Sequence, residues 1–268
     1  MHALDLPATP SIQWSICAID LSDGTTLLDH SSATVLRMAS VGKILLLIEV
    51  ARGLASGELD PARLLTRCAD DAVADSGLWQ HLSSDTLPIV DAAALIGAMS
   101  DNLATNVLLR EIGLSRVDRV ADDLGLSSTR LLDRVRDVRT KDDPPALSTG
   151  SAADLARLLG QLSTGQVYSP GVSRQVMEWL SWGTDLSMVA AAFGLDPLAH
   201  LEMDRDLMVK NKTGTNAEVR ADVGVVHGRR TSAAYAVIAN GTMSQGPDRD
   251  TVLATMRAIG EILRQTVS

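Results

Sequence analysis

The chain has 268 residues, of which 46% are hydrophobic and 21% are charged, and its formal net charge is −9. This composition is typical of a globular protein and excludes an intrinsically disordered chain. The negative charge, without a dense basic run, argues against nucleic acid or an anionic membrane surface as a partner. The length allows one large core or two fused lobes.

Strand patterns come first along the chain. Residues 11–21 alternate and are followed by a turn into residues 25–28, which predicts a β-hairpin. The apolar run from Ser40 to about Ala55 is too long for a strand and predicts a buried helix. Five further helical patterns follow at Val90–Met99, Asn102–Ile112, Ser115–Leu124, Ala152–Leu162 and Ser173–Leu180.

After about Met208 the chain becomes rich in β-formers, with expected strands at Asp222–His227 and Ala233–Asn240 and a final helix at Arg249–Gln265. Strands at both ends with helices between them predict an α/β (α+β) fold. We expect an α/β lobe of residues 1–37 and 190–268 and a helical lobe of residues 38–189. The active site is expected in the cleft between these lobes.

The first motif with chemical potential is Ser40-Val41-Gly42-Lys43, at the start of the predicted helix. Residues three apart share a helix face, so we expect the Ser40 hydroxyl to meet the Lys43 amine. The free N–H groups of the helix start disfavour a second positive charge, which would lower the pKa of Lys43 and suit it to act as a base. The alternative is an N-capping serine beside a lysine that reaches solvent.

The second motif, Ser100-Asp101-Asn102, falls between two helical patterns. Ser100 offers a hydroxyl that can pass a proton to a leaving group, and Asn102 offers an amide for a substrate amide. Asp101 is expected to accept hydrogen bonds from nearby backbone N–H groups. The alternative for the whole triplet is a simple helix cap.

The third motif, Lys212-Thr213-Gly214, is expected on or beside a strand edge. Gly214 lets a ligand approach the backbone, and an edge strand can pair with a peptide-like substrate. Lys212 and Thr213 are suited to holding a carboxylate. The alternative is a lysine that protects an exposed sheet edge from aggregation.

In this order the three motifs resemble the S-x-x-K, S-D-N and K-T-G signature of penicillin-recognising serine hydrolases, and the chain looks closest to class A β-lactamases. Asn106 completes a pattern similar to the S-D-N-x-A-x-N helix of that family, and Thr215 follows K-T-G. The resemblance covers nearly the whole chain from Ser11. It implies a β-lactamase/transpeptidase-like fold, with an antiparallel sheet flanked by helices from both termini and an inserted all-helical lobe.

The resemblance also implies roles for single residues. Ser40 would form the acyl-enzyme, with Lys43 as its neighbouring base. Ser100 would pass a proton to the leaving nitrogen, and Lys212 would act beside it. The residues implied in substrate binding are Asn102, Thr213, Gly214, Thr215 and Arg220. The backbone N–H groups of Ser40 and Thr215 would form the oxyanion hole. Trp79 is either the aromatic gate of the site or a core residue.

One departure from the resemblance concerns the Ω-loop glutamate of class A β-lactamases, which is accepted as the deacylation base. The corresponding residues 134–139 read Arg-Val-Arg-Asp-Val-Arg and contain no glutamate. Asp137 is the nearest acid, but it is one position off and the two arginines beside it would keep it a weak base. An ester between Ser40 and a β-lactam is therefore expected to hydrolyse slowly.

Three functions are open on this basis. The first is a serine hydrolase that forms an acyl-enzyme at Ser40 with a β-lactam or a similar amide or ester, and releases it slowly. The second is an esterase or a D-Ala-D-Ala-peptidase-like enzyme, in which a smaller acyl group leaves room for water. The third is a non-hydrolytic protein that binds or senses β-lactams.

The remaining expectations concern location and partners. The first residues lack the charged and apolar segments of a signal peptide, so we expect a cytoplasmic protein, secreted only if the sequence was trimmed. No apolar run reaches the roughly 18 residues of a membrane span. The five histidines and two cysteines show no ligand spacing, so no metal or cofactor is expected, and nothing requires a Cys17–Cys68 disulfide. We expect a monomer acting on a small-molecule substrate.

Overall fold

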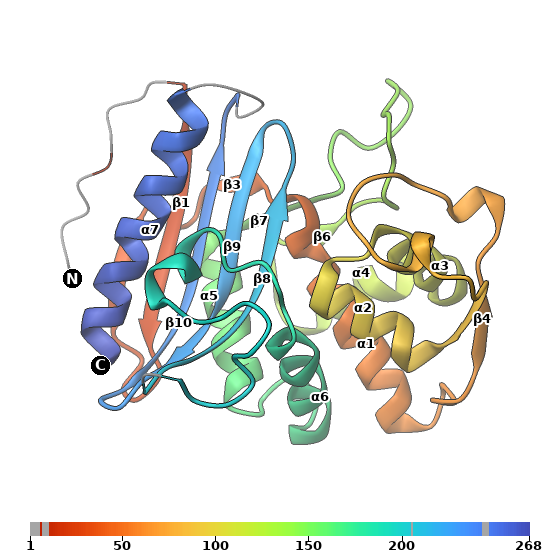
Figure 1. Ribbon diagram of the computed structural model, residues 1–268, viewed down its shortest axis with the longest axis horizontal. Coiled ribbons are helices and arrows are strands. Elements are labelled where there is room, and N and C mark those ends of the chain that lie inside the picture. Colours follow the sequence, from red (N-terminus) through yellow and green to blue (C-terminus); the bar gives the residue numbers. More distant parts are fainter. Residues whose placement is uncertain (1–5, 7–10, 205, 243–246) are drawn as a thin grey trace.

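The computed structural model describes residue 6 and residues 11–204, 206–242 and 247–268. Its central element is a five-stranded antiparallel sheet in the order β2-β1-β10-β9-β8 (Figure 1). The strands are β1 (Gln13–Asp20), β2 (Thr26–His30), β8 (Met208–Thr215), β9 (Val219–His227) and β10 (Ser232–Asn240). Because β1 pairs with β10, the two ends of the chain build one sheet, as the sequence predicts.

Seven α-helices occur within the described residues, and six of them match predicted helices closely in extent. Their bounds are α1 (Lys43–Ser56), α2 (Ile89–Met99), α3 (Asn102–Ile112), α4 (Leu114–Asp123), α5 (Ala152–Ser163), α6 (Pro170–Ser181) and α7 (Pro247–Val267). The exception is the predicted helix from Ser40. Its first residues form a separate 3-10 turn, η1 (Ala39–Gly42), and the α-helix begins only at Lys43.

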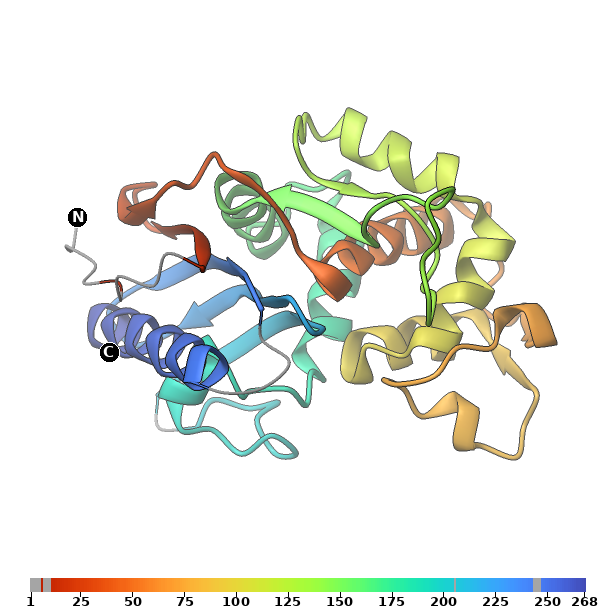
Figure 2. The ribbon, with the colours of Figure 1, turned by 90° about the horizontal axis from the view of Figure 1, so that it is seen from above.

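Both faces of the sheet are covered, which explains why its strands are apolar throughout rather than alternating with polar residues. Ala236 and Ile238 of β10 belong to the core that α5 and the helices beyond it complete. Tyr235 and Val237, on the opposite face, belong to the core beneath α7. Figure 2 shows the sheet from above, with α7 on one side and α5 on the other.

The helices α1 to α4 lie beside the sheet and form the other end of the molecule (Figure 1). Helix α5 falls in the range that the sequence analysis gives to the helical lobe, yet it packs on β1, β9 and β10 of the sheet. The lobe boundaries themselves stay a prediction. A helix from the N-terminus, which the family resemblance implies, falls mostly on residues 1–5 and 7–10, outside the described residues.

Two small sheets complete the fold, and neither was predicted because their strands have only two to four residues. One joins β3 (Val35–Arg37), β7 (Ser148–Ser151) and β6 (Arg130–Leu131), and the other joins β4 (Leu64–Thr66) and β5 (Thr86–Pro88). Strand β3 leads directly into η1. Its pairing with β7 therefore fixes the direction in which the chain enters the turn that carries Ser40.

Three general features of the fold bear on the sequence expectations. No helix among the described residues is both long enough and apolar enough to cross a membrane. Cys17, on β1, is buried, whereas Cys68 is exposed, and both are free thiols. Within the same residues no group of three or more histidine, cysteine, aspartate or glutamate side chains gathers to hold a metal ion.

Candidate active site

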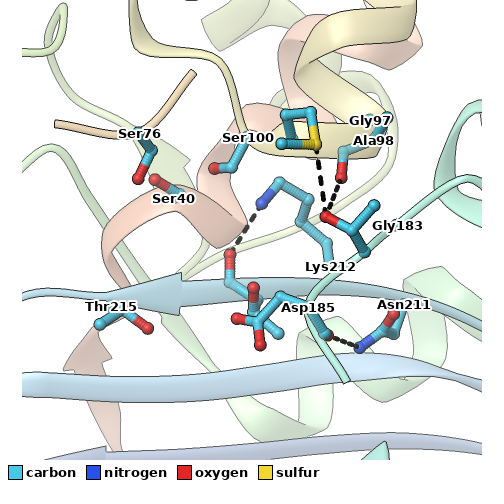
Figure 3. A pocket seen from close by; sticks show the side chains of 13 residues that line it. Ser40, Ser76, Gly97, Ala98, Ser100, Gly183, Asp185, Asn211, Lys212 and Thr215 are labelled. Atoms are coloured by element: carbon cyan, nitrogen blue, oxygen red, sulfur yellow. Dashed lines mark hydrogen bonds between the residues drawn. The ribbon is translucent and has the colours of Figure 1, made fainter. Parts of the chain in front are cut away.

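The three sequence motifs, far apart in the chain, meet at one cavity of about 120 Å³ between η1, the end of α2 and strand β8. Ser40 and Ser100 line it from one side, and Lys212, Thr213 and Thr215 line it from β8. Figure 3 shows the Lys212 side chain reaching from the strand toward Ser100. The edge position predicted for the third motif is confirmed, since β8 is the last strand of the sheet.

Ser40 lies in the η1 turn and borders both this cavity and a second one of about 320 Å³. The turn is entered through Ala39, whose φ of 47° is in the left-handed region that non-glycine residues rarely adopt. Such a conformation persists only where the surroundings enforce it, and it is common at functional sites. The nucleophile candidate is therefore held by a turn, not by the first turn of an α-helix.

Lys43 is fully buried, and its amine is held by partners from the second motif. Its Nζ donates to the Ser100 carbonyl oxygen at 2.7 Å and to Asn102 Oδ1 at 2.7 Å, and it lies 3.4 Å from Ser100 Oγ. The predicted contact with Ser40 is not among the hydrogen bonds of the described residues. The Lys43 amine is instead bound by the Ser100 carbonyl oxygen and by Asn102 Oδ1, which take both of its short hydrogen bonds.

The surroundings of Lys43 favour the neutral amine. Burial lowers the pKa of Lys43 well below the usual lysine range and the charge of Lys212 lowers it further, while Asp101 and Asp75 act in the opposite direction. A neutral amine has two N–H groups and one lone pair. The two 2.7 Å bonds use both N–H groups, so the lone pair is left to accept a proton from a hydroxyl.

Residues of the second motif line the cavities at Ser40 or support the residues that line them. Ser100 ends α2 with a left-handed φ of 56°, and Asp101 caps α3 by accepting from the Ala104 amide at 2.8 Å. The same carboxylate accepts from the amides of Leu78 and Trp79 at 2.7 and 2.8 Å. Asp101 thus ties a distant loop to the start of α3, which agrees with its predicted structural part.

Asn102 uses both ends of its amide inside the protein. Its Oδ1 accepts from Lys43 Nζ, and its Nδ2 donates to the Ala74 carbonyl oxygen at 3.1 Å. The side chain therefore positions the lysine and the loop at the same time. It still borders the second cavity beside Ser40, so its second N–H can face a bound ligand.

Lys212 is 3% exposed and donates to the Thr213 carbonyl oxygen at 2.8 Å. Burial lowers the pKa of Lys212 to about 8, although the charges of Asp185 and Asp222 partly oppose this. Asp222 is itself buried, and burial raises its pKa to about 6. With its pKa lowered to about 8, Lys212 is charged at lower pH and becomes neutral as pH rises through that value.

The pKa of Lys212 predicts how binding of a carboxylate should depend on pH. As pH rises through about 8, Lys212 loses its positive charge, so the apparent affinity for a substrate that carries a carboxylate should fall. A neutral nitrophenyl ester should not show this loss. Acylation measured against substrate concentration on both sides of that pKa checks the expectation. Identical pH profiles of KM for the two substrates would contradict it.

Gly214 permits the close approach of β8 to the η1 turn. A Cβ at this position would lie 2.2 Å from the Met38 carbonyl oxygen and 3.1 Å from the Ser40 amide nitrogen. Gly214 borders neither of the two cavities at Ser40. Gly214, predicted from the sequence to bind substrate, therefore packs against the backbone of Met38 and Ser40.

Gly214→Ala is expected to push β8 away from the turn that carries Ser40. A displacement on the order of 1 Å at a reacting group can slow a reaction by up to about 10²-fold. The measurement is the rate of covalent labelling of Ser40. Gly171→Ala in α6 serves as the control, since its new methyl would meet nothing closer than 3.7 Å. Equal labelling rates in both variants would show that the close packing at Gly214 is dispensable.

Two residues singled out from the sequence are buried and line neither cavity at Ser40, although Arg220 pairs with Thr215 across β8 and β9. Arg220 is 7% exposed, its guanidinium donates to the carbonyl oxygens of Asn216 and Val219, and it borders neither cavity at Ser40. Trp79 is fully buried, with its Nε1 donating to the Ser84 carbonyl oxygen at 3.0 Å. Trp79 is thus a core residue, and the aromatic-gate interpretation is wrong.

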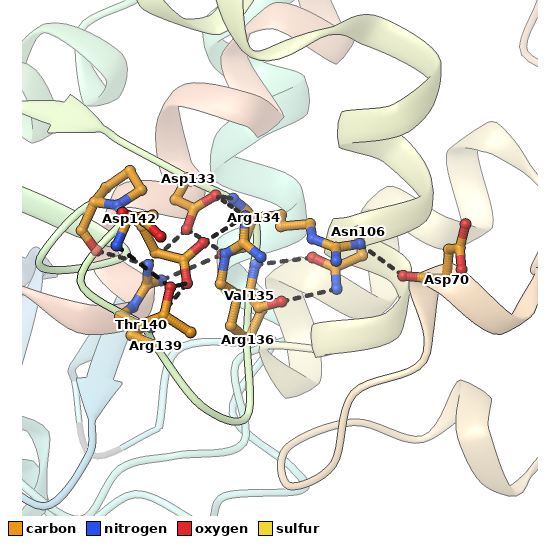
Figure 4. A network of polar contacts seen from close by, with 11 residues as sticks. Asp70, Asn106, Asp133, Arg134, Val135, Arg136, Arg139, Thr140 and Asp142 are labelled. Carbon is orange, nitrogen blue, oxygen red and sulfur yellow. Dashed lines mark hydrogen bonds and ion pairs between the residues drawn. The ribbon is translucent and has the colours of Figure 1, made fainter.

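The second cavity lies between Ser40 and the loop that replaces the Ω loop. It borders Ser40, Asn102, Val135 and Asp137, and its volume is about 320 Å³. The loop is held by Asp133, which accepts from Arg136 Nε at 2.7 Å and from Arg139 at 2.6 Å (Figure 4). Burial opposes ionisation of Asp133, but these hydrogen bonds prevail and hold its pKa below the usual value.

Val135 occupies the wall of this cavity because its backbone is clamped on both sides. The Asn106 side chain accepts from the Val135 amide at 2.9 Å and donates to the Val135 carbonyl oxygen at 3.0 Å (Figure 4). Sequence reasoning missed Val135. The sequence signal that could have revealed it is Asn106, at the end of the S-D-N-x-A-x-N pattern. A side-chain amide of this kind can bind both the N–H and the carbonyl group of one residue.

Asp137, the nearest acid of the loop, also borders the cavity, and its Oδ1 accepts from the Ala74 amide at 2.9 Å. Sequence reasoning missed Asp75 and Ser76, which lie on the loop opposite, and Asp185, which borders the first cavity. These residues belong to no motif. Asp101 and Asn102 bind the backbone of the loop that carries Asp75 and Ser76, whereas the Asp185 carbonyl oxygen accepts from Asn211 Nδ2 at 3.2 Å.

Comparison with known proteins agrees with this geometry. Solved structures similar to the chain include a β-lactamase from Sphaerobacter thermophilus, with 22% identity and a TM-score of 0.83, and PBP-A, with 18% identity and a TM-score of 0.82. Each comparison covers 97% of this chain and 92% of the other. The fold is therefore the α+β fold of β-lactamases and penicillin-binding proteins.

Sequence comparison gives a further match. A β-lactamase of Streptomyces albus G is 28% identical over 172 residues, which are 62% of this chain and 54% of the relative. The aligned part thus spans about half the length of that curated relative. Residues 4–267 match the family described as the Beta-lactamase enzyme family. With three motifs at one cavity, a buried lysine beside them and a family match over almost the whole length, this chain belongs to the Beta-lactamase enzyme family.

Proposed function

We propose that this protein is a serine hydrolase that forms an acyl-enzyme at Ser40 with a β-lactam or a similar amide or ester. The observation that carries the proposal is the buried Lys43, whose amine is oriented by two hydrogen bonds within the second motif, next to the cavity that Ser40 lines. A serine hydroxyl becomes a nucleophile when a base removes its proton, and a neutral lysine can act as that base.

Acylation follows from the positions of these groups. Ser40 Oγ attacks the substrate carbonyl carbon and gives its proton to neutral Lys43. Backbone N–H groups of Ser40 and Thr215 are suited to stabilise the oxyanion. The proton then passes through Ser100 Oγ, 3.4 Å from Lys43 Nζ, to the leaving nitrogen or oxygen. Lys212 and Thr213 are suited to hold a substrate carboxylate, because both line the cavity from β8.

Release of the acyl group is expected to be slower than its formation. Val135, whose backbone is held by Asn106, borders the same cavity as Ser40, and its aliphatic side chain cannot take a proton from water. The structure of a PBP-A mutant as an acyl-enzyme complex with penicillin G covers 96% of this chain, with 19% identity and a TM-score of 0.80. This likeness supports a penicillin as the first ligand to test.

The test mixes the protein with a chromogenic cephalosporin, a penicillin and a nitrophenyl ester, and follows turnover together with intact mass. The proposal expects a covalent β-lactam adduct that forms quickly and decays slowly. Turnover of the ester without any β-lactam adduct would favour the esterase or peptidase-like alternative. An adduct that never decays would favour a β-lactam sensor. The absence of both adduct and turnover would contradict all three.

A further inference from the structure

The loop opposite Val135 carries an acidic residue at the mouth of the second cavity. Asp75 borders that cavity together with Ser40 and Asn102. Its side chain is exposed, so water has free access to it. The carboxylate also raises the pKa of Lys43, which places its charge within electrostatic reach of the site's amine.

The backbone at Asp75 is held in an unusual conformation. Its φ is 74°, in the left-handed region. The carbonyl oxygen of Asp75 accepts from Gln80 Nε2 at 2.8 Å, and the carbonyl oxygen of Ser76 accepts from the backbone N–H of Asn102 at 2.9 Å. The backbone amide of the preceding residue, Ala74, donates to the Asp137 carboxylate. The Ala74 carbonyl oxygen accepts from the Asn102 side chain. A strained residue held on both sides in this way is typical of functional positions.

Three carboxylates border the second cavity, and they differ in what binds them. Glu218 forms an ion pair with Arg37. Asp137 accepts from the Ala74 amide. No hydrogen bond or ion pair reaches the Asp75 carboxylate within the described part of the chain. Of the three groups, Asp75 is therefore the one whose oxygens are both available to a water molecule in the cavity that Ser40 also borders.

We propose that Asp75 is the general base that activates water for hydrolysis of the Ser40 acyl-enzyme, an inference that rests on the proposed acyl-enzyme function. The Asp75 carboxylate takes a proton from water as the water oxygen bonds to the ester carbonyl carbon. The tetrahedral intermediate then collapses, the bond from carbon to Ser40 Oγ breaks, and the proton held by Asp75 returns to Oγ. The products are the free serine and the carboxylic acid, with no further reactant.

The test separates acylation from deacylation in Asp75→Asn. Asparagine tolerates the left-handed backbone, so the loop conformation is retained. Each protein is labelled with a penicillin, freed of excess reagent and followed by intact mass. Decay of the adduct should slow by at least about 10²-fold, the usual scale for a lost general base, while the labelling rate stays within about twofold. The exposed loop substitution Asp142→Asn serves as the control and should decay like the parent protein.

Release of the acyl group by hydroxylamine, and labelling of the parent protein, show which part of the proposal a negative result contradicts. Hydroxylamine needs no general base, so it should remove the acyl group from Asp75→Asn and from the parent at similar rates. Decay that is unchanged in Asp75→Asn, or that slows instead in Asp137→Asn, would overturn the role of Asp75. Failure of the parent protein to be labelled at all would instead contradict the acyl-enzyme function, so the two failures are distinguishable.

Discussion

Ser40→Ala is expected to abolish every covalent adduct with β-lactams and esters, because no other group supplies the Oγ that becomes acylated. The loss should be complete in intact-mass spectra, not merely a slower rate. Non-covalent binding of a penicillin should persist, since Lys212 and Thr213 on β8 are untouched. Calorimetric titration of the variant checks this second expectation.

The matched control for Ser40→Ala is Ser76→Ala, which removes another hydroxyl that borders the same two cavities. Its adduct should still form. If the adduct survived in Ser40→Ala and disappeared in Ser76→Ala, the nucleophile would be Ser76 and the assignment of the S-x-x-K serine would be wrong. Peptide mapping of the labelled parent protein gives the same answer without any substitution.

Lys43→Ala should slow acylation of Ser40 by at least about 10²-fold, the usual scale for the loss of a general base. The substitution also removes the donor to Asn102 Oδ1 and the Ser100 carbonyl oxygen. Leaving such buried acceptors unpaired costs about 1–3 kcal/mol each. Stopped-flow labelling gives the rate, and thermal unfolding confirms that the variant is folded at the assay temperature.

Lys43→Met refines this test, since methionine fills more of the volume of the lysine stem but cannot take a proton. Both variants should lose acylation to a similar degree if the amine acts as the base. A rate close to that of the parent protein in Lys43→Met would assign Lys43 a packing function only. In the parent, acylation should quicken as pH rises through the lowered pKa of Lys43, because only the neutral amine accepts a proton.

Much of the fold follows from local sequence patterns. The helix predicted at Asn102–Ile112 agrees with α3 at both ends, since Asp101 supplies the cap and Gly113 the end. The convergence of the three motifs was predictable from the family resemblance, which constrains order and spacing. The hydrogen-bond partners of Lys43 were not, because its amine binds Ser100 and Asn102, which lie 57 and 59 residues later in the chain.

The parts that escaped prediction depend on contacts between distant residues. Val135 reaches the cavity because Asn106, 29 residues earlier, binds its backbone. Asp75 is placed there because the Asn102 side chain binds the carbonyl of Ala74, 28 residues earlier. Neither Val135 nor Asp75 belongs to a periodic pattern or a motif. Such positions become visible only when the loops are assembled around the buried asparagines.

The clamp at residue 135 has a consequence for how a family can change its kinetics. The Asn106 side chain binds only the backbone N–H and carbonyl groups of Val135. Any residue placed at position 135 would therefore be held by the same two hydrogen bonds. A substitution at residue 135 can therefore change a side chain that borders the cavity at Ser40 without removing these two hydrogen bonds. Residue 135 is thus a position at which the lifetime of a covalent state could be adjusted separately from the base proposed at Asp75.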